Sequence, residues 1–322
     1  MKKFLSTICL ILLVSLHQCN LRFKRIYDPK PIGSIGSQIE NKNITRTKLQ
    51  FIVIGDWGEK GNFYQKDVAS AIEKIMRERK IDFILTTGDN FYPNGVENIS
   101  DSHFKKSFEE IYSFAQETPW YISLGNHDYY GNIQALIDYQ KSNKNWILPS
   151  TYYSLIANVA DTDALFLITD TNEFIKIAGF PYRTYIDSNL NQIQIKWMND
   201  TLSQSLYGWK IVAGHHPIFS GGDHGDTEVL KKDFLDIMEA NQVDIYFSGH
   251  DHDLQYLRHP DYRTHFFISG AGSKVRKLKN NPNTVFAKSE AGFILTTLEN
   301  KTATIEFVNS SGIEIYKTKI EK

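Results

Sequence analysis

Short apolar runs that end in glycine or aspartate recur along the chain from Leu49 onward. We expect these runs to form strands, at residues 51–54, 83–86, 120–124, 165–169, 211–213 and 245–247. The stretches between them have the period of a helix, as in residues 65–78, where Val68, Ile72 and Ile75 share one face. Further helices are expected at residues 101–115, 189–203 and 228–240. The alternation of strands and helices predicts an α/β fold.

The last part of the chain has a different pattern. After His252 the helical period disappears, and short strands are expected at residues 264–269, 293–298, 303–308 and 313–317. No internal repeat and no low-complexity segment is found. The sequence therefore predicts an α/β domain with a β-rich end.

The first residues have the three parts of a secretory signal peptide. A basic start at residues 1–3 is followed by an apolar run at residues 4–16, which turns polar at residues 17–20. This run is too short to span a bilayer comfortably, so an uncleaved membrane anchor is the less favoured alternative. We expect a signal peptide at residues 1–19 and a lead-in without periodicity at residues 20–47.

Composition and charge limit the class of protein and the partners that can be expected. The chain has 322 residues, of which 41% are hydrophobic and 23% charged, which suits one large domain with a packed core at residues 48–322. The formal net charge of −1 gives no electrostatic reason to expect nucleic acid or an anionic membrane as partner. No second long apolar run follows the first, so no stable membrane insertion is expected. Five Asn-x-Ser/Thr sequons fit a glycosylated protein of the secretory pathway, extracellular or in a lysosome-like vacuole, at Asn43, Asn98, Asn199, Asn300 and Asn309.

Five predicted strands end in a glycine followed by residues that can bind metal. The segments are Gly55-Asp56-Trp57-Gly58, Gly88-Asp89-Asn90-Phe91-Tyr92, Gly125-Asn126-His127-Asp128, Gly214-His215-His216-Pro217 and Gly249-His250-Asp251-His252. Any one of them could be an ordinary turn, but five in succession indicate a site at the carboxyl ends of the strands. Oxygen donors and imidazoles without an available thiolate suit iron, manganese or zinc. Two such metals would need a bridging ligand, for which a carboxylate is the natural candidate.

The five segments, in this order, resemble those of the purple acid phosphatases, and specifically the small tartrate-resistant type. The resemblance covers about residues 49–269. Many metallophosphoesterases begin with Asp-x-His, whereas this chain has Asp56-Trp57-Gly58, and glycine cannot bind a metal through a side chain. In the resembling family a tyrosine, here Tyr92, binds Fe(III) through its phenolate and produces the purple colour. The fold implied is a calcineurin-like metallophosphoesterase domain, a four-layer α/β/β/α sandwich with two mixed sheets.

The resemblance also implies a role for each matching residue. The ferric ion would be bound by Asp56, Tyr92 and His252, the divalent ion by Asn126, His215 and His250, and both by Asp89 as a bridge. The divalent ion would be Fe(II), Zn(II) or Mn(II). The resemblance further implies that His127 and His224 orient the substrate phosphate and help to protonate the leaving alcohol. His224 is matched by spacing alone, nine residues after His215.

Several neighbouring residues are expected to support the site without binding metal. His216 stands where small mammalian members have tyrosine, and a supporting or solvent-facing role is expected, with substrate binding as the alternative. Asp128 and Asp251 are expected to form hydrogen bonds beside the ligands. His103 and His265 match no motif and are expected to be structural or surface residues.

The implied activity is that of a secreted acid phosphatase. It would hydrolyse phosphomonoesters, of small molecules or phosphoproteins, by attack of a metal-bound hydroxide, and it would act as a monomer. One alternative is a phosphodiesterase or phosphoprotein phosphatase of the same superfamily, which the tyrosine at position 92 disfavours. Another is a scaffold, because some apicomplexan relatives anchor the motility machinery through a C-terminal transmembrane helix that this sequence lacks. Generation of reactive oxygen species by a diiron centre is a third possibility.

Overall fold

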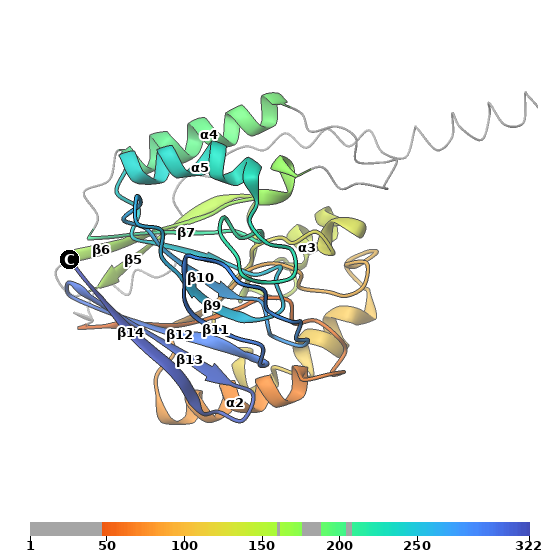
Figure 1. Cartoon of the computed structure of the whole chain (residues 1–322). Helices are drawn as coiled ribbons and strands as arrows, with labels where there is room; N and C mark the ends of the chain where they lie inside the picture. Colours follow the sequence, from red (N-terminus) through yellow and green to blue (C-terminus); the bar gives the residue numbers. More distant parts are fainter. Residues whose placement is uncertain (1–46, 160–161, 176–187, 204–207) are drawn as a thin grey trace, which may run out of the picture. The chain divides into compact units, whose positions relative to one another are not determined.

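Two mixed β-sheets stacked face to face form the centre of the fold (Figure 1). The computed structural model describes residues 47–159, 162–175, 188–203 and 208–322. The predicted signal peptide and nearly all of the predicted lead-in lie outside the described residues. The assignment of residues 48–322 to a single domain stays a prediction.

The first sheet joins the beginning and the end of the described chain, in the order β14-β13-β12-β1-β2-β3-β4. Its strands are β1 (Leu49–Ile54), β2 (Phe83–Thr86), β3 (Trp120–Tyr121), β4 (Trp146–Ile147), β12 (Gly292–Glu299), β13 (Thr302–Asn309) and β14 (Glu314–Glu321). Strands β1 to β4 are parallel, and β12 to β14 continue the sheet from β1 as an antiparallel meander. The carboxyl ends of β1, β2 and β3 therefore lie at one edge of this sheet.

The second sheet has the order β11-β9-β10-β8-β7-β6-β5. Its strands are β5 (Tyr153–Val159), β6 (Thr162–Ile168), β7 (Trp209–Ala213), β8 (Ile245–Ser248), β9 (Leu254–Leu257), β10 (His265–Ser269) and β11 (Thr284–Lys288). Strands β6, β7, β8 and β10 are parallel, whereas β5, β9 and β11 pair antiparallel at the two sides. The carboxyl ends of β7 and β8 again share one edge.

Aromatic side chains hold the two sheets together. The ring of Phe166 on β6 meets the rings of Phe51 on β1 and Phe83 on β2 edge-on, with centroids 5.3 and 5.5 Å apart. The ring of Phe51 also meets that of Phe247 on β8 at 6.2 Å. All of β1 is buried because both faces of the sheet are covered. Burial of each such side chain stabilises the fold by about 2–3 kcal/mol, so the contact between the sheets is a main source of stability.

Helices cover the outer faces of both sheets (Figure 1). The α-helices are α2 (Gln65–Glu78), α3 (Ile133–Tyr139), α4 (Ser188–Ser203) and α5 (Glu228–Ala240). Helix α2 packs on the first sheet against β13, and α4 and α5 pack on the second sheet through a buried apolar cluster that includes Met198, Val212 and Phe234. These layers confirm the predicted four-layer α/β/β/α sandwich. None of the described helices is long and apolar enough to cross a membrane.

The helices expected at residues 65–78, 189–203 and 228–240 are confirmed, α4 starting one residue earlier than predicted. Residues 101–115, however, form a π-helical turn at Phe104–Glu109 and a 3₁₀ turn at Ser113–Ala115 instead of one α-helix. The buried residues Phe104, Phe108 and Tyr112 recur every four positions. This spacing exceeds the period of an α-helix, and the wider π turn keeps the three side chains on one face.

The fold also predicts how stability depends on pH through His265 at the start of β10. Burial, and then the charges of Arg258 and Arg263, lower the pKa of His265 to about 4, and its Nδ1 contacts the hydroxyl of Tyr256 at 2.8 Å. Unfolded histidine titrates near about 6.5. The unfolded chain therefore binds more protons between these values, and this histidine makes folding less favourable as the pH falls from about 6.5 to about 4. We expect His265→Gln to flatten this slope in urea unfolding; an unchanged slope would contradict the assignment.

Candidate metal centre

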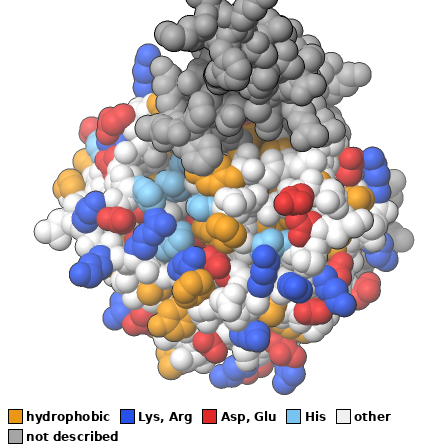
Figure 2. All heavy atoms as spheres, turned by 90° about the vertical axis from the view of Figure 1, so that its right-hand side faces the viewer, with side chains coloured by type: hydrophobic (Ala, Val, Ile, Leu, Met, Phe, Trp, Pro, Cys, Tyr) orange, Lys and Arg blue, Asp and Glu red, His pale blue; other side chains and the backbone are white. Residues whose placement is uncertain are grey.

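The predicted ligands follow the carboxyl ends of strands from both sheets. Asp56 follows β1, Asp89 follows β2, and Asn126 comes after β3 in the first sheet, whereas His215 follows β7 and His250 follows β8 in the second. Histidine side chains gather on the face that Figure 2 turns toward the viewer, with lysine, arginine and acidic side chains beside them. The stacking of the sheets thus brings together residues from distant parts of the chain.

Three of the predicted ligands have strained backbones. Asp56, Asp89 and His250 have φ values of 58°, 51° and 68°, in the left-handed region that non-glycine residues rarely adopt. Each such residue costs on the order of 1 kcal/mol. The backbone N–H of Asp56 donates to the carbonyl of Gly88 at 3.0 Å, and that of His250 donates to Oδ2 of Asp56 at 2.9 Å. These bonds hold the sharp turns that aim the side chains at one another.

The hydroxyl of Tyr92 is the centre of one half of the cluster. It donates to Asp56 Oδ1 or Asp89 Oδ2, each 2.9 Å away, and lies 3.1 Å from Nε2 of His252. Nε2 of His252 is also 3.4 Å from Oδ1 of Asp56. All four side chains are at most 5% exposed. The structure therefore brings together the four residues that the family resemblance assigns to the ferric ion and the bridge.

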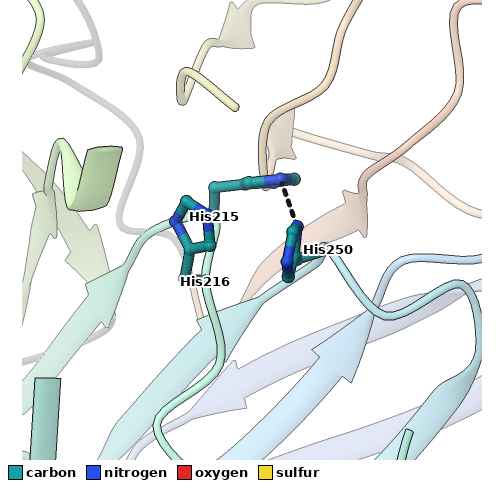
Figure 3. Close-up of side chains that lie close together, drawn as sticks. All are labelled: His215, His216 and His250. Carbon is teal, nitrogen blue, oxygen red and sulfur yellow. Dashed lines mark hydrogen bonds between the residues drawn. The ribbon is translucent and has the colours of Figure 1, made fainter. Parts of the chain in front are cut away.

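The imidazole of His215 is the centre of the other half (Figure 3). Its Nε2 lies 3.1 Å from Oδ1 of Asn126 and 3.1 Å from Nδ1 of His250. The same nitrogen is 3.5 Å from Oδ2 of Asp89, the oxygen that also contacts Tyr92. Asp89 is thus the residue common to both halves.

The charge in this cluster calls for a cation. Asp56 and Asp89 are 0% and 1% exposed, and no lysine or arginine nitrogen among the described residues lies within 4.0 Å of either carboxylate. Burial, aided by the charge of Asp89, raises the pKa of Asp56 well above its usual range. Buried carboxylates without positive partners are costly. The donor set therefore fits bound metal ions, which would compensate this charge.

The environment of the imidazoles favours their neutral form, which can donate a lone pair to a metal ion. Burial is the main cause that lowers the pKa of His250 well below its usual value and that of His252 to about 4. Nδ1 of His215 lies 2.8 Å from the carbonyl of Thr87, to which it can only donate. This bond leaves the lone pair of His215 on Nε2, the atom that faces the other donors.

The two aspartates beside the ligands hold loops in place, as expected. Asp128 is fully buried and accepts the backbone N–H groups of Gly125 and Asn90, each within 3.2 Å. Its burial, with the charge of Asp89, raises its pKa to about 8. Asp251 accepts the backbone N–H of His224 at 2.8 Å and the hydroxyl of Ser220. Their carboxylates are engaged in fixing the loops that carry Asp89 and His224.

His127 and His224 border the cluster at different residues. The ring of His127 is 4.4 Å from that of Tyr92, and its Nε2 is 4.0 Å from Oδ2 of Asp89. The ring of His224 stacks on that of His250 at 4.1 Å. Each histidine therefore borders a different half of the cluster.

His216 is not solvent-facing, and a ring nitrogen of His216 lies within 4.8 Å of ring nitrogens of His215 and His250. It is 4% exposed, and its ring is 4.5 Å from that of His250 (Figure 3). The Thr171 hydroxyl oxygen accepts the backbone N–H groups of His215 and His216 at 3.2 and 3.1 Å. Its own proton is then available for Nδ1 of His216, 2.9 Å away. A neutral His216 would consequently carry its ring proton on Nε2.

Three residues beside the site were not predicted from the sequence. Nε2 of His103 lies 2.6 Å from the carbonyl of Tyr92 and donates to it. The ammonium of Lys274 is 5.2 Å from the ring of Tyr92, and Nη1 of Arg276 contacts Nε2 of His224. Nothing in the sequence pattern points to His103. The two basic residues do follow another strand end, that of β10, and this signal could have found them.

Comparison with known proteins agrees with this geometry. Residues 49–254 match the sequence model of the calcineurin-like phosphoesterase family. Purple acid phosphatase 3 of Arabidopsis thaliana is 34% identical over 284 residues, which are 83% of this chain and 71% of the relative. Tartrate-resistant acid phosphatase type 5 of Sus scrofa is 30% identical over 316 residues, 90% of this chain and 92% of the relative. The chain belongs to the purple acid phosphatases.

As a purple acid phosphatase, the protein is an enzyme that hydrolyses phosphoesters at a metal centre. The family assignment made from the five strand-end segments is confirmed. A solved structure with the same fold is that of GAP50, the anchor in the inner membrane complex of Plasmodium, with a TM-score of 0.75 and 26% identity over 86% of this chain and 89% of that one. The fold is thus shared with a protein described as an anchor, so the side chains of the site must carry the functional argument.

Proposed function

We propose that the chain is a secreted acid phosphatase that hydrolyses phosphomonoesters at a dinuclear centre of Fe(III) and a divalent ion. The divalent ion would be Fe(II), Zn(II) or Mn(II). One observation carries the proposal: the Tyr92 hydroxyl lies within 3.1 Å of two carboxylates and an imidazole in a buried cluster. A phenolate is a hard donor that suits a ferric ion. Membership of the family shows that the chain hydrolyses phosphoesters at a metal centre; the presence of iron and the secretion of the chain are our inferences.

The two halves of the cluster suggest how the ligands divide. We assign Asp56, Tyr92 and His252 to the ferric ion and Asp89 to the bridge. The divalent ion would be held by Asn126, His215 and His250. Support comes from the contacts, because Oδ2 of Asp89 lies 2.9 Å from the hydroxyl of Tyr92 and 3.5 Å from Nε2 of His215. A metal in each half would be within reach of this one oxygen.

Such a metal pair, when bound, supplies a nucleophile at acidic to neutral pH and neutralises charge on the phosphoryl group. The residues of the chain would orient the substrate around it. Nδ1 of His127 donates to the carbonyl of Pro93, which turns Nε2 toward the side of the cluster where Asp89 lies. We propose that His127 and His224 hold the phosphate from its two sides and help to protonate the leaving alcohol.

Several further features of the protein are proposed from the sequence. A signal peptide at residues 1–19 would direct the chain into the secretory pathway, to the extracellular space or a lysosome-like vacuole. After the lead-in at residues 20–47, residues 48–322 would form one domain that acts as a monomer. The substrates would be phosphomonoesters of small molecules or proteins. Nucleic acid and stable membrane insertion are not expected, in keeping with the net charge of −1.

Removal of the Tyr92 hydroxyl tests the assignment of the ferric site. The iron-loaded protein is expected to be coloured by charge transfer from the phenolate to Fe(III). Tyr92→Phe is expected to lose this visible band, because phenylalanine keeps the ring but cannot bind the ion. The measurement is metal analysis together with a visible spectrum of the protein from its native source, and of the variant.

Tyr130→Phe is a matched control, because Tyr130 contacts His127 by its ring, 5.1 Å away, outside the ligand set. It is expected to keep the band. A wild-type protein with two irons per chain and no visible band would contradict the ferric assignment and would favour a phosphodiesterase or phosphoprotein phosphatase. Absence of hydrolysis of p-nitrophenyl phosphate over about pH 4 to pH 8 at full metal occupancy would overturn the phosphatase proposal.

The likeness to the Plasmodium anchor supports a second candidate, that of a scaffold. The enzyme is favoured because all seven assigned ligand residues are present in one largely buried cluster, which a purely structural protein has no need to maintain. Three of these residues, Asp56, Asp89 and His250, also have strained backbone conformations with positive φ. A metal-loaded protein that is inactive toward phosphomonoesters but captures a membrane would favour the scaffold.

A further inference from the structure

Arg276 carries a positive charge at the rim of the site and acts on the described carboxylates of Asp223 and Asp253 only from beyond ion-pair distance. Its neighbours in sequence differ in this respect, since Lys274 pairs with Glu59 and Lys279 pairs with Asp223. No carboxylate oxygen of the described residues lies within 4.0 Å of the Arg276 guanidinium. Arginine stays charged at every physiological pH. A positive charge beside a phosphatase site that forms no ion pair among the described residues suggests an anionic substrate as its partner.

The segment that carries Arg276 is fixed to the metal centre at two points. The backbone N–H of Arg276 donates to the carbonyl of His252 at 2.8 Å. The hydroxyl of Ser273 donates to the carbonyl of Asp56 at 2.5 Å. Both acceptors belong to residues assigned to the ferric ion. The position of Arg276 relative to the centre is therefore set by the same backbone that holds the ligands.

The guanidinium reaches across to the other half of the site. Its Nη1 contacts Nε2 of His224, whose ring stacks on that of His250 at 4.1 Å. Because arginine only donates, Nε2 of His224 must act as the acceptor. Burial lowers the pKa of both His224 and His252, and the charge of Arg276 lowers each further. The charge is thus close to residues of both halves.

We propose that Arg276 is a catalytic residue that binds oxygen atoms of the substrate's phosphoryl group. This inference rests on the proposed phosphatase function and deepens it. The planar guanidinium offers two parallel donors that match two phosphate oxygens, which a lysine ammonium cannot do. When substrate binds, a phosphate oxygen replaces Nε2 of His224 as the acceptor of Arg276. This exchange frees His224 to face the leaving oxygen.

The test uses the metal-loaded full chain with p-nitrophenyl phosphate as substrate and inorganic phosphate as competitive inhibitor. Arg276→Gln is expected to lower kcat/KM by about 100-fold, as loss of an electrostatic donor does, and to raise the inhibition constant of phosphate at least about tenfold. Arg276→Lys is expected to fall between wild type and Arg276→Gln, because it keeps the charge and loses the paired donors. Lys277→Gln removes a positive charge from an exposed neighbour and is expected to stay within about twofold of wild type.

Metal content separates binding from structure. The proposal is supported if Arg276→Gln keeps two metals per chain and binds phosphate more weakly. It is overturned if kcat/KM and phosphate affinity both stay within about twofold of wild type. It is also overturned if Arg276→Gln loses activity only in proportion to lost metal, with an unchanged phosphate affinity for each metal-loaded site. A wild-type protein that is inactive at full metal occupancy would instead sink the proposed function, and calorimetric titration of phosphate would still test Arg276.

Discussion

Asp89→Asn is expected to lower kcat/KM for p-nitrophenyl phosphate by about 1,000-fold or more, roughly 4 kcal/mol of transition-state stabilisation. Oδ2 of Asp89 is the atom shared by the two halves of the centre, 2.9 Å from the Tyr92 hydroxyl and 3.5 Å from Nε2 of His215. Asparagine has nearly the same shape but no charge, and in the proposed assignment it would put an NH₂ group or a weaker carbonyl where Asp89 would hold both ions. The change should therefore spare the fold and disable the centre.

The control for this prediction removes a carboxylate elsewhere. Asp200 lies on α4 and forms a surface pair with Lys196 at 2.5 Å, so Asp200→Asn is expected to change kcat/KM by less than about twofold. The measurements are kcat/KM, metal ions per chain and Tm for both variants. The bridging role of Asp89 is wrong if Asp89→Asn keeps two metals and more than about a tenth of wild-type activity.

The sequence predicted much of the centre because its chemistry is local. Each ligand stands within a few residues of a strand end, and the buried strands have apolar runs that are easy to identify. Parallel strands end at a common edge, so the sequence alone leads one to expect that Asp56 and Asp89 meet. Tyr92 was identified by a second local feature, the glycine at position 58 where related sequences have a histidine.

The residues that the sequence did not reveal depend on non-local backbone pairing. Arg276 reaches the site because its N–H bonds to the carbonyl of His252, and His103 because its Nε2 donates to the carbonyl of Tyr92. Strands β4, β5, β9 and β11 were also missed. β4 has only two residues, β5 and β9 include polar residues, and β11 is only partly buried. β4, β5 and β11 are edge strands, which have weak sequence signals.

The fold alone would not have separated an enzyme from an anchor, since GAP50 superposes with a TM-score of 0.75. The functional argument therefore depends on the side chains at the strand ends of this chain and on the space left for each. Gly58 shows this most directly. A Cβ at this position would lie 1.8 Å from the carbonyl oxygen of Asn90, and the carbonyl of Gly58 accepts the N–H of Tyr92 at 3.0 Å. The segment that carries Tyr92 therefore occupies the space where an Asp-x-His histidine would begin.

Gly58→Ala is accordingly expected to destabilise the protein by roughly 3 kcal/mol, because a backbone carbonyl cannot move aside as a flexible side chain can. Tm should fall by roughly 5–10 °C for a domain of this size, and the displaced segment should take Tyr92 away from Asp56 and weaken the colour of the iron-loaded protein. Gly312→Ala is the matched control: Gly312 has a φ of 75°, but a Cβ there would meet nothing closer than 3.5 Å, so only about 1 kcal/mol of backbone strain is expected. Calorimetry and a visible spectrum of both variants decide the matter. If Gly58→Ala were no less stable than Gly312→Ala and kept its full colour, the close approach of residues 58 and 90 would not be what sets Tyr92 in the site.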